Sequence, residues 1–290
     1  MTWQLVLAGF LIAFVIGLTG MGGGALMTPV LVLFFGVAPL AAVSSDLVAS
    51  LVMKPVAAVV HLRRGTVRLP LVRLLCYGSV PAAFCSAFAL SRIDDQVSAQ
   101  SFLRTALGVA LLLAVAAMVA RMIMNQRGRF EPAGTLRPRP VVTVLIGVAG
   151  GVIVGLTSVG SGSLIIAALS LLYPGLRAAG LVGTDLVQAI PLVGSAALGH
   201  LLFGDVRFDL TAAILLGALP GVFLGARLSS TERFGMIRPV LLIVLVASGL
   251  ALLRASNLVV LGVVAGSVVL AVLAWLVQRQ NGRRANLGEG

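Results

Sequence analysis

Long apolar stretches follow one another along almost the whole chain. They cover residues 3–19, 24–38, 40–62, 69–91, 101–124, 141–156, 161–174, 178–203, 209–229, 237–254 and 257–277. A helix of about 20 apolar residues crosses a bilayer, whereas one of about 15 is marginal. The shorter stretches lie beside two clusters of glycine. The pattern therefore predicts an all-α polytopic membrane protein in which helices are interrupted at these clusters.

Composition supports the membrane assignment. Of the 290 residues, 59% are hydrophobic and 10% are charged, whereas a soluble domain has about 25% charged residues. The first residues, "MTWQLVLAGF", have no basic group before the apolar run, so we expect a retained first segment and no cleaved signal. Cys76 and Cys85 have no metal-binding spacing and are interpreted as small core residues.

The net charge of +12 comes mainly from arginine. Arginines gather in residues 63–73, 121–139, 227–238 and 279–284, whereas the loops at 94–95 and 205–209 balance their charge. Under the positive-inside rule this places the N-terminus outside and the C-terminus in the cytoplasm. No basic soluble domain is present, so nucleic-acid binding is not expected.

The chain repeats itself. "GLTGMGGGALM" from residue 17 matches "GLTSVGSGSLI" from residue 155, and "SDLV" from residue 45 matches "TDLV" from residue 184. Further matches in order join His61 to His200, Gly65 and Val67 to Gly204 and Val206, and "GSVPAAF" to "GALPGVF". Each half has five apolar stretches, and an odd number requires the second copy to be inverted. The predicted divisions are a first repeat (1–124), a cytoplasmic linker (125–140), an inverted second repeat (141–256), an extra transmembrane helix (257–278) and a cytoplasmic tail (279–290).

Inverted repeats with interrupted helices are typical of secondary transporters. A break at membrane depth points free N–H groups into a cavity, and helix N-termini attract anions. We therefore expect the two breaks to bind an anionic substrate. The residues assigned to this site at the breaks are Gly20, Gly22, Gly23, Gly24, Ser158, Gly160, Ser161, Gly162 and Ser163. The alternative is close helix packing through small residues. That alternative is favoured for two series spaced by four, Gly147, Gly151 and Gly155, and Gly217, Gly221 and Gly225.

Few ionisable residues lie within the apolar stretches. Asp46, Ser50 and Lys54 follow at a spacing of four on one helix face, with Asp46 and Lys54 about 12 Å apart along the axis. Lys54 is the sole lysine of the sequence, and its counterpart is Val193. We expect Lys54 to bind the anion and Asp46 and Asp185 to take up protons.

Two alternatives stay open for these ionisable groups. Asp46 and Asp185 follow Ser45 and Thr184 near expected helix starts, where such residues cap helices. Capping and proton uptake are compatible. For His61 and His200 a hydrogen-bonded interfacial side chain is favoured over a role in transport.

The segments "GLTGMGGGALMTPVL", "SSDL", "GLTSVGSGSL" and "GTDL" resemble the sulfite exporter TauE/SafE family, also called the toluene sulfonate uptake permease family. The resemblance covers nearly the whole chain. It implies transport of sulfur-containing anions such as sulfite or organosulfonates across the bacterial inner membrane, often by export. It carries site roles to Gly20, Gly22, Gly23, Gly24, Ser45, Asp46, Gly160, Gly162, Thr184 and Asp185. Lys54 has no place in the family pattern, so its role depends on chemistry alone.

The expected function is thus a proton-coupled secondary exporter of small sulfur-containing anions. The alternatives are an anion channel or a transporter of other organic anions on the same fold. A cation transporter is disfavoured because Lys54 would repel its substrate. The sequence has no P-loop for a primary pump and no rhomboid-like serine or HExxH motif, so no enzyme is expected. We expect no cofactor or metal; the partners are the anion and membrane lipid, and homo-oligomerisation is left open.

Overall fold

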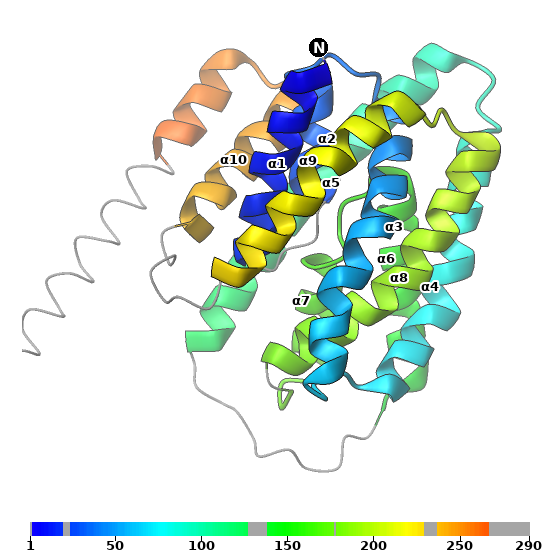
Figure 1. Ribbon diagram of the computed structural model, residues 1–290, viewed down its shortest axis with the longest axis vertical. Coiled ribbons are helices and arrows are strands. Elements are labelled where there is room, and N and C mark those ends of the chain that lie inside the picture. Colours follow the sequence, from blue (N-terminus) through cyan, green and yellow to red (C-terminus); the bar gives the residue numbers. More distant parts are fainter. Residues whose placement is uncertain (1, 20–23, 127–137, 177, 229–236, 267–290) are drawn as a thin grey trace, which may run out of the picture.

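The computed structural model describes residues 2–19, 24–126, 138–176, 178–228 and 237–266. All regular elements in these ranges are helices (Figure 1). They are α1 (Thr2–Thr19), α2 (Gly24–Leu33), α3 (Pro39–Arg63), α4 (Leu69–Leu90), α5 (Gln96–Gln126), α6 (Pro140–Thr157), α7 (Leu164–Leu172), α8 (Ala178–Phe203), α9 (Phe208–Leu228) and α10 (Ile237–Leu252). A further short apolar helix covers Asn257–Gly266.

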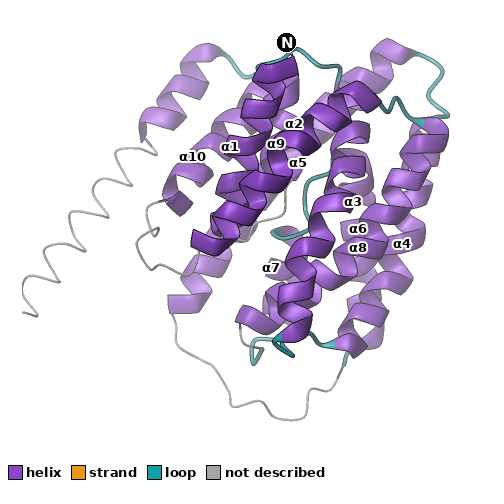
Figure 2. Cartoon of the chain, in the orientation of Figure 1, coloured by secondary structure: helices purple, strands orange, loops and turns teal. Residues whose placement is uncertain are grey.

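Six of the described helices, α3 to α6, α8 and α9, are long and apolar enough to cross a membrane. The helices α1, α2 and α10 are apolar but shorter. The predicted class of all-α polytopic membrane protein is therefore confirmed. The loop between α6 and α7 lies at mid-height of the bundle, between α3 and the α1–α9 pair (Figure 2), so an irregular segment lies at membrane depth.

The closest helix pairs join the two halves of the chain. α1 packs along α9, and α4 packs along α6. The sequence register matches α1 to α6 and α4 to α9, so these two pairs combine equivalent helices from opposite halves. Two further pairs, α3 with α8 and α5 with α10, each join a helix to its own counterpart. The two halves thus interlock, because the first helix of each half packs against the fourth helix of the other half.

Glycine lets the helices of two pairs, α1 with α9 and α4 with α6, approach each other closely. Gly217, Gly221 and Gly225 of α9 lie against backbone carbonyls of α1, and Gly147, Gly151 and Gly155 of α6 lie against carbonyls of α4. A Cβ atom at any of these positions would overlap the facing backbone. The expectation that these two series serve helix packing is confirmed.

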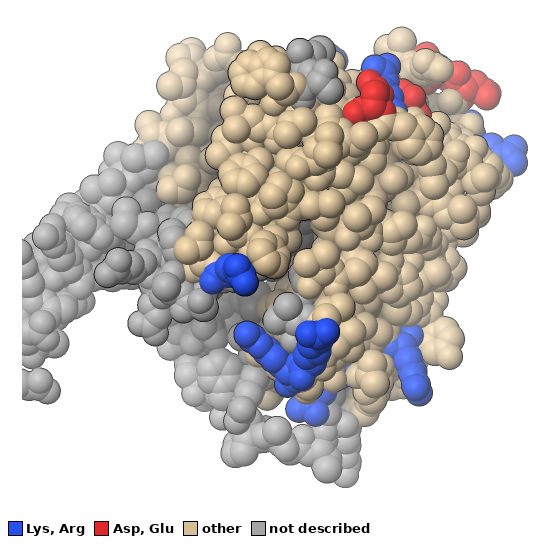
Figure 3. Space-filling view, viewed as in Figure 1, with Lys and Arg blue, Asp and Glu red and all other residues tan. Residues whose placement is uncertain are grey.

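Charged side chains gather at opposite ends of the bundle (Figure 3). The acidic end, defined by Asp94, Asp95, Asp205 and Asp209, holds the α4–α5 and α8–α9 connections. The arginine end, defined by Arg63, Arg64, Arg68 and Arg227, holds the α3–α4 connection and the last turn of α9. The middle of the bundle between them is apolar on the face shown.

An aspartate does cap a helix, but it is Asp95. Its carboxylate accepts hydrogen bonds from the Ser98 hydroxyl (2.6 Å) and from the backbone N–H groups of Val97 (3.0 Å) and Ser98 (3.2 Å) at the start of α5. These bonds hold the pKa of Asp95 below its usual range. By contrast, Asp46 and Asp185 lie beyond the first turns of α3 and α8. The capping interpretation of these two residues was wrong because α3 begins at Pro39 and α8 at Ala178, so that each aspartate lies well inside its helix.

The glycine contacts predict a difference between two otherwise similar substitutions. Gly217→Ala should lower the free energy of unfolding by about 1–3 kcal/mol, because its methyl group would overlap the Val6 carbonyl. Gly262→Ala should leave stability unchanged or raised, because no described atom lies within 4 Å of that Cβ position. Thermal unfolding of both variants in detergent tests this, and equal melting temperatures would contradict it.

Candidate functional site

The break between α6 and α7 is a tight left-handed turn. α6 ends at Thr157, and the next residue, Ser158, has φ 58° and donates its N–H to the Val154 carbonyl (2.7 Å). Gly160 and Gly162 follow with φ of 124° and 95°. Glycine adopts such angles without steric cost, which explains why "SVGSGS" is rich in glycine.

Part of the backbone of this turn is satisfied within the turn. The Gly160 carbonyl accepts the N–H groups of Leu164 (3.0 Å), Ser163 (3.4 Å) and Ile165 (3.4 Å). These first-turn donors of α7 are therefore engaged, because the left-handed glycines fold the loop back over the helix start. The expected anion cradle at Gly160, Ser161 and Gly162 stays a prediction.

The residue that follows the first break contacts the second break. Gly24, the first residue of α2, packs so tightly on Ser158 that a Cβ would overlap the Ser158 carbonyl. Gly20, Gly22 and Gly23 lie outside the described residues. The residues flanking both breaks are therefore in contact at the centre of the bundle.

A buried lysine reaches the second break. The Lys54 ammonium group donates a hydrogen bond to the hydroxyl of Ser161, and only 7% of Lys54 is exposed. Its charge interacts with two carboxylates, first Asp185 and then Asp46. Lys54 thus joins the break to the aspartates of both halves, which the helical spacing alone did not show.

Asp46 lies beside the first break. Its Oδ2 atom accepts a hydrogen bond from the Thr28 hydroxyl of α2 (2.8 Å), and the residue is fully buried. The Ser158 hydroxyl lies close enough to affect the carboxylate without completing a hydrogen bond to Oδ1. Within the described part of the chain, Oδ1 of Asp46 has no hydrogen-bond partner.

Asp185 has different surroundings. Its Oδ1 atom accepts a hydrogen bond from Gln188 Nε2 (3.0 Å), one turn further along α8. The Ser79 hydroxyl of α4 in turn donates to Gln188 Oε1 (3.3 Å). Thr28, Ser79 and Gln188 were not identified from the sequence. Gln188 could have been found as a polar residue one turn after an intramembrane aspartate.

Ser45 and Thr184, two residues expected at the site, accept hydrogen bonds from connections between helices. Ser45 Oγ accepts the backbone N–H of Arg207 (3.2 Å), and Thr184 Oγ1 accepts the backbone N–H of Arg68 (3.0 Å). Arg68 and Arg207 each precede a helix, and they correspond in the repeat register. The hydroxyl before each aspartate therefore fastens its helix to a connection in the other half, whereas the aspartate is buried near the breaks. Ser163 begins α7, and its buried Oγ has no partner among the described residues.

The two histidines differ. His200 is buried, with Nδ1 bonded to the Ser44 hydroxyl (2.7 Å) and Nε2 to the Gly155 carbonyl (2.7 Å). His61 bonds to Thr66 (3.1 Å), and the residue that corresponds to Ser44 is Gly183, which lies against His61. Both histidines have hydrogen-bond partners, as favoured, and His200 is buried.

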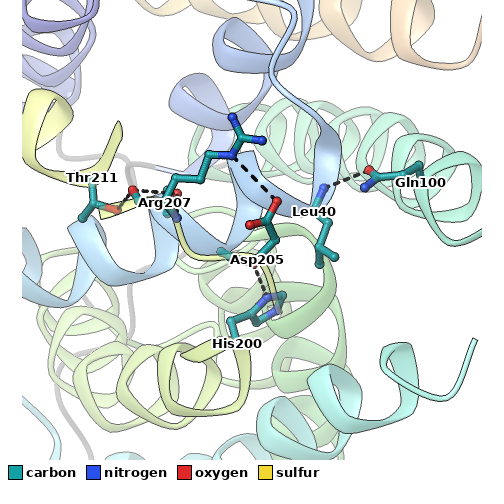
Figure 4. A network of polar contacts seen from close by, with 8 residues as sticks. Leu40, Gln100, His200, Asp205, Arg207 and Thr211 are labelled. Carbon is teal, nitrogen blue, oxygen red and sulfur yellow. Dashed lines mark hydrogen bonds and ion pairs between the residues drawn. The ribbon is translucent and has the colours of Figure 1, made fainter. Parts of the chain in front are cut away.

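A polar network surrounds His200 at the acidic end (Figure 4). Arg207 pairs with Asp205 (3.8 Å), and its backbone carbonyl accepts the Thr211 hydroxyl (2.9 Å). Gln100 of α5 accepts the N–H of Leu40 at the start of α3 (3.2 Å). The ends of α3, α8 and α9 are thus tied together here. On the face shown in Figure 3, the surface is hollowed between α9 and α3, with basic side chains along its lower edge.

Interrupted helices that meet at a buried charged cluster inside a polytopic bundle are typical of membrane transporters. The comparisons with known proteins agree. The chain belongs to the sulfite exporter TauE/SafE family, whose model matches residues 5–252. Two relatives from Bacillus subtilis (strain 168) are named as probable membrane transporter proteins. YjnA is 34% identical over 256 residues, covering 87% of this chain and 100% of the relative. YdhB is 23% identical over 252 residues, covering 86% and 99%. No solved structure matches the chain significantly.

The hydroxyl of Thr184 offers a test of its structural role. Thr184→Val should lower the free energy of unfolding by about 1–3 kcal/mol, because the Arg68 N–H loses its acceptor. Thr184→Ser keeps the acceptor and should resemble the wild type. Thermal unfolding and anion binding are measured for both. A Thr184→Val protein of normal stability that no longer binds anions would instead return Thr184 to the substrate site.

Proposed function

We propose that this protein is a secondary transporter that exports small sulfur-containing anions, such as sulfite or organosulfonates, across the bacterial inner membrane in a proton-coupled cycle. The observation that carries the proposal is the buried Lys54 ammonium group at the second break. A lysine in the bilayer is costly and usually marks a pathway. The membership in the TauE/SafE family supports the sulfur chemistry of the substrate.

In this proposal the anion binds between Lys54 and the hydroxyls that surround it. Ser161 already contacts the ammonium group, and Ser158 and Thr28 lie at the same junction, beside Asp46. Hydroxyls donate to sulfonate oxygens, and a charge-assisted bond from lysine is stronger than a neutral one. The same groups would suit other small oxyanions, so transport of other organic anions is the second candidate.

The two charged ends support the proposed membrane orientation. With the arginine end facing the cytoplasm and the acidic end facing outward, the N-terminus would lie outside. The C-terminus would be cytoplasmic after the predicted extra helix 257–278, of which residues 267–278 lie outside the described residues. The transport cycle of the proposed inverted five-helix repeats, 1–124 and 141–256, would rearrange the bundle around the breaks. The hollow between α9 and α3 lies toward the cytoplasm in this orientation (Figure 3).

Lys54→Met should weaken anion binding by about 10- to 100-fold, since a hydrogen bond to a charged group contributes about 1.5–3 kcal/mol. Lys54→Arg keeps the charge and should retain most of the affinity. Titration calorimetry of sulfite and methanesulfonate with the purified proteins measures this. Unchanged affinity in a folded Lys54→Met protein would remove lysine from the site.

Proton coupling is tested at the two aspartates. Asp46→Asn and Asp185→Asn remove one titratable carboxyl each while keeping its shape. At least one of them should bind the anion but lose flux driven by a pH gradient in proteoliposomes. Wild-type coupling in both variants would leave the aspartates with a structural role. An anion channel, the remaining alternative, would show no uphill flux in the wild type.

A further inference from the structure

The charges buried at the breaks limit which anions can enter. Among the described residues the buried acidic and basic side chains, apart from His200, are Asp46, Lys54 and Asp185. With all three ionised, the empty site carries a net charge of −1. A bound monoanion would make the net charge of the site −2, and a bound dianion would make it −3. Such like charges are poorly screened away from water, so a site of this composition needs a proton with its anion.

Based on this inventory, and resting on the proposed function, we propose that the site takes only singly charged oxyanions, each together with one proton that Asp46 accepts. The proton comes from a hydronium ion or a buffer acid in the aqueous phase, whose conjugate base stays in solution, and it forms an O–H bond at the Asp46 carboxylate. With Asp46 neutral, Lys54, Asp185 and a monoanion sum to −1. This is the charge of the empty site, so binding adds no net charge to the membrane interior.

The hydrogen bonds favour Asp46 as the acceptor. Asp185 receives the Gln188 amide and interacts electrostatically with Lys54. Both interactions stabilise its ionised form. Asp46 accepts Thr28 on Oδ2, whereas Oδ1 is buried without a partner in the described part of the chain. A proton on Oδ1 removes a buried charge and turns this unused acceptor into a donor.

Other ionisable groups near α3 do not replace Asp46. On α8, both ring nitrogens of His200 already have partners, Ser44 and Gly155. α9 carries Asp209 and Arg227 near its two ends, and α5 carries Arg104. Among the described residues, Lys54 is the charged group that acts on the Asp46 carboxylate. Among the described charged groups, Lys54 is therefore the one that links the proton on Asp46 to the bound anion.

Two consequences follow for specificity and energetics. A dianion would need a second proton, and Asp185 is committed to Lys54 and Gln188, so sulfate is rejected although it resembles a sulfonate in shape. Movement of a monoanion with one proton is electroneutral. Flux should then follow the anion and proton gradients in either direction and ignore the membrane potential.

The test uses methanesulfonate, which is a monoanion at every working pH, so that any proton taken up goes to the protein. The full-length protein is titrated near neutral pH in weak buffer with a pH indicator. We expect uptake of about one proton per bound anion, and sulfate should bind roughly tenfold more weakly or worse. Asp46→Asn should bind methanesulfonate with no proton uptake, whereas Asp185→Asn should retain the uptake. Thermal unfolding verifies that both variants are folded.

The outcomes separate this inference from the proposed function. If neither sulfite nor methanesulfonate binds, the proposed function fails, and the inference fails with it. If methanesulfonate binds without proton uptake, or sulfate binds equally well, only the charge rule is overturned. Uptake that persists in Asp46→Asn and disappears in Asp185→Asn would overturn the assignment of the proton to Asp46.

Discussion

Backbone polar groups need partners wherever water is absent, and this constraint shapes the centre of the molecule. A chain that stops and restarts a helix at membrane depth exposes several such groups at once. Here the Gly160 carbonyl collects the first N–H groups of α7, and Ser158 closes the end of α6. In the proposed site, side chains therefore take part in recognition. Lys54 and the two aspartates could change the charge of such a site by releasing or taking up protons, which a fixed set of peptide dipoles cannot do.

The Ser/Thr-Asp pairs show how one short motif serves two purposes. Ser45 and Thr184 hold connections of the opposite half, and the next residue in each case is a buried carboxylate. Adjacent residues on a helix point about 100° apart, so one can face a neighbouring connection while the other faces the centre. The position of each carboxylate is thereby set by a bond between the halves.

Much of the fold could be predicted from the sequence, because hydrophobic length and glycine spacing are local signals. The apolar stretches became helices, and the two glycine series became packing faces. The site was only partly predictable. The contact of Lys54 with Ser161 joins residues 107 positions apart, and no periodicity reports such a contact. Thr28 and Gln188 were missed for the same reason. The engagement of the first N–H groups of α7 by the Gly160 carbonyl was not predicted, because the path of a glycine-rich turn depends on φ angles, which composition does not specify.

The glycine-lined contacts of α1 with α9 and of α4 with α6, called the glycine seams, determine which helices can move together as a rigid body. Backbone packed directly on backbone leaves no side chains to rearrange, so α1 should stay with α9 and α4 with α6 in any conformational change. Each of these units contains one helix from either half of the sequence. The mechanical parts of the molecule are therefore not its duplicated parts. A hinge must run across the repeats, through interfaces such as α3 with α8. Each half expressed as a separate chain would lack the partner helix of both seams.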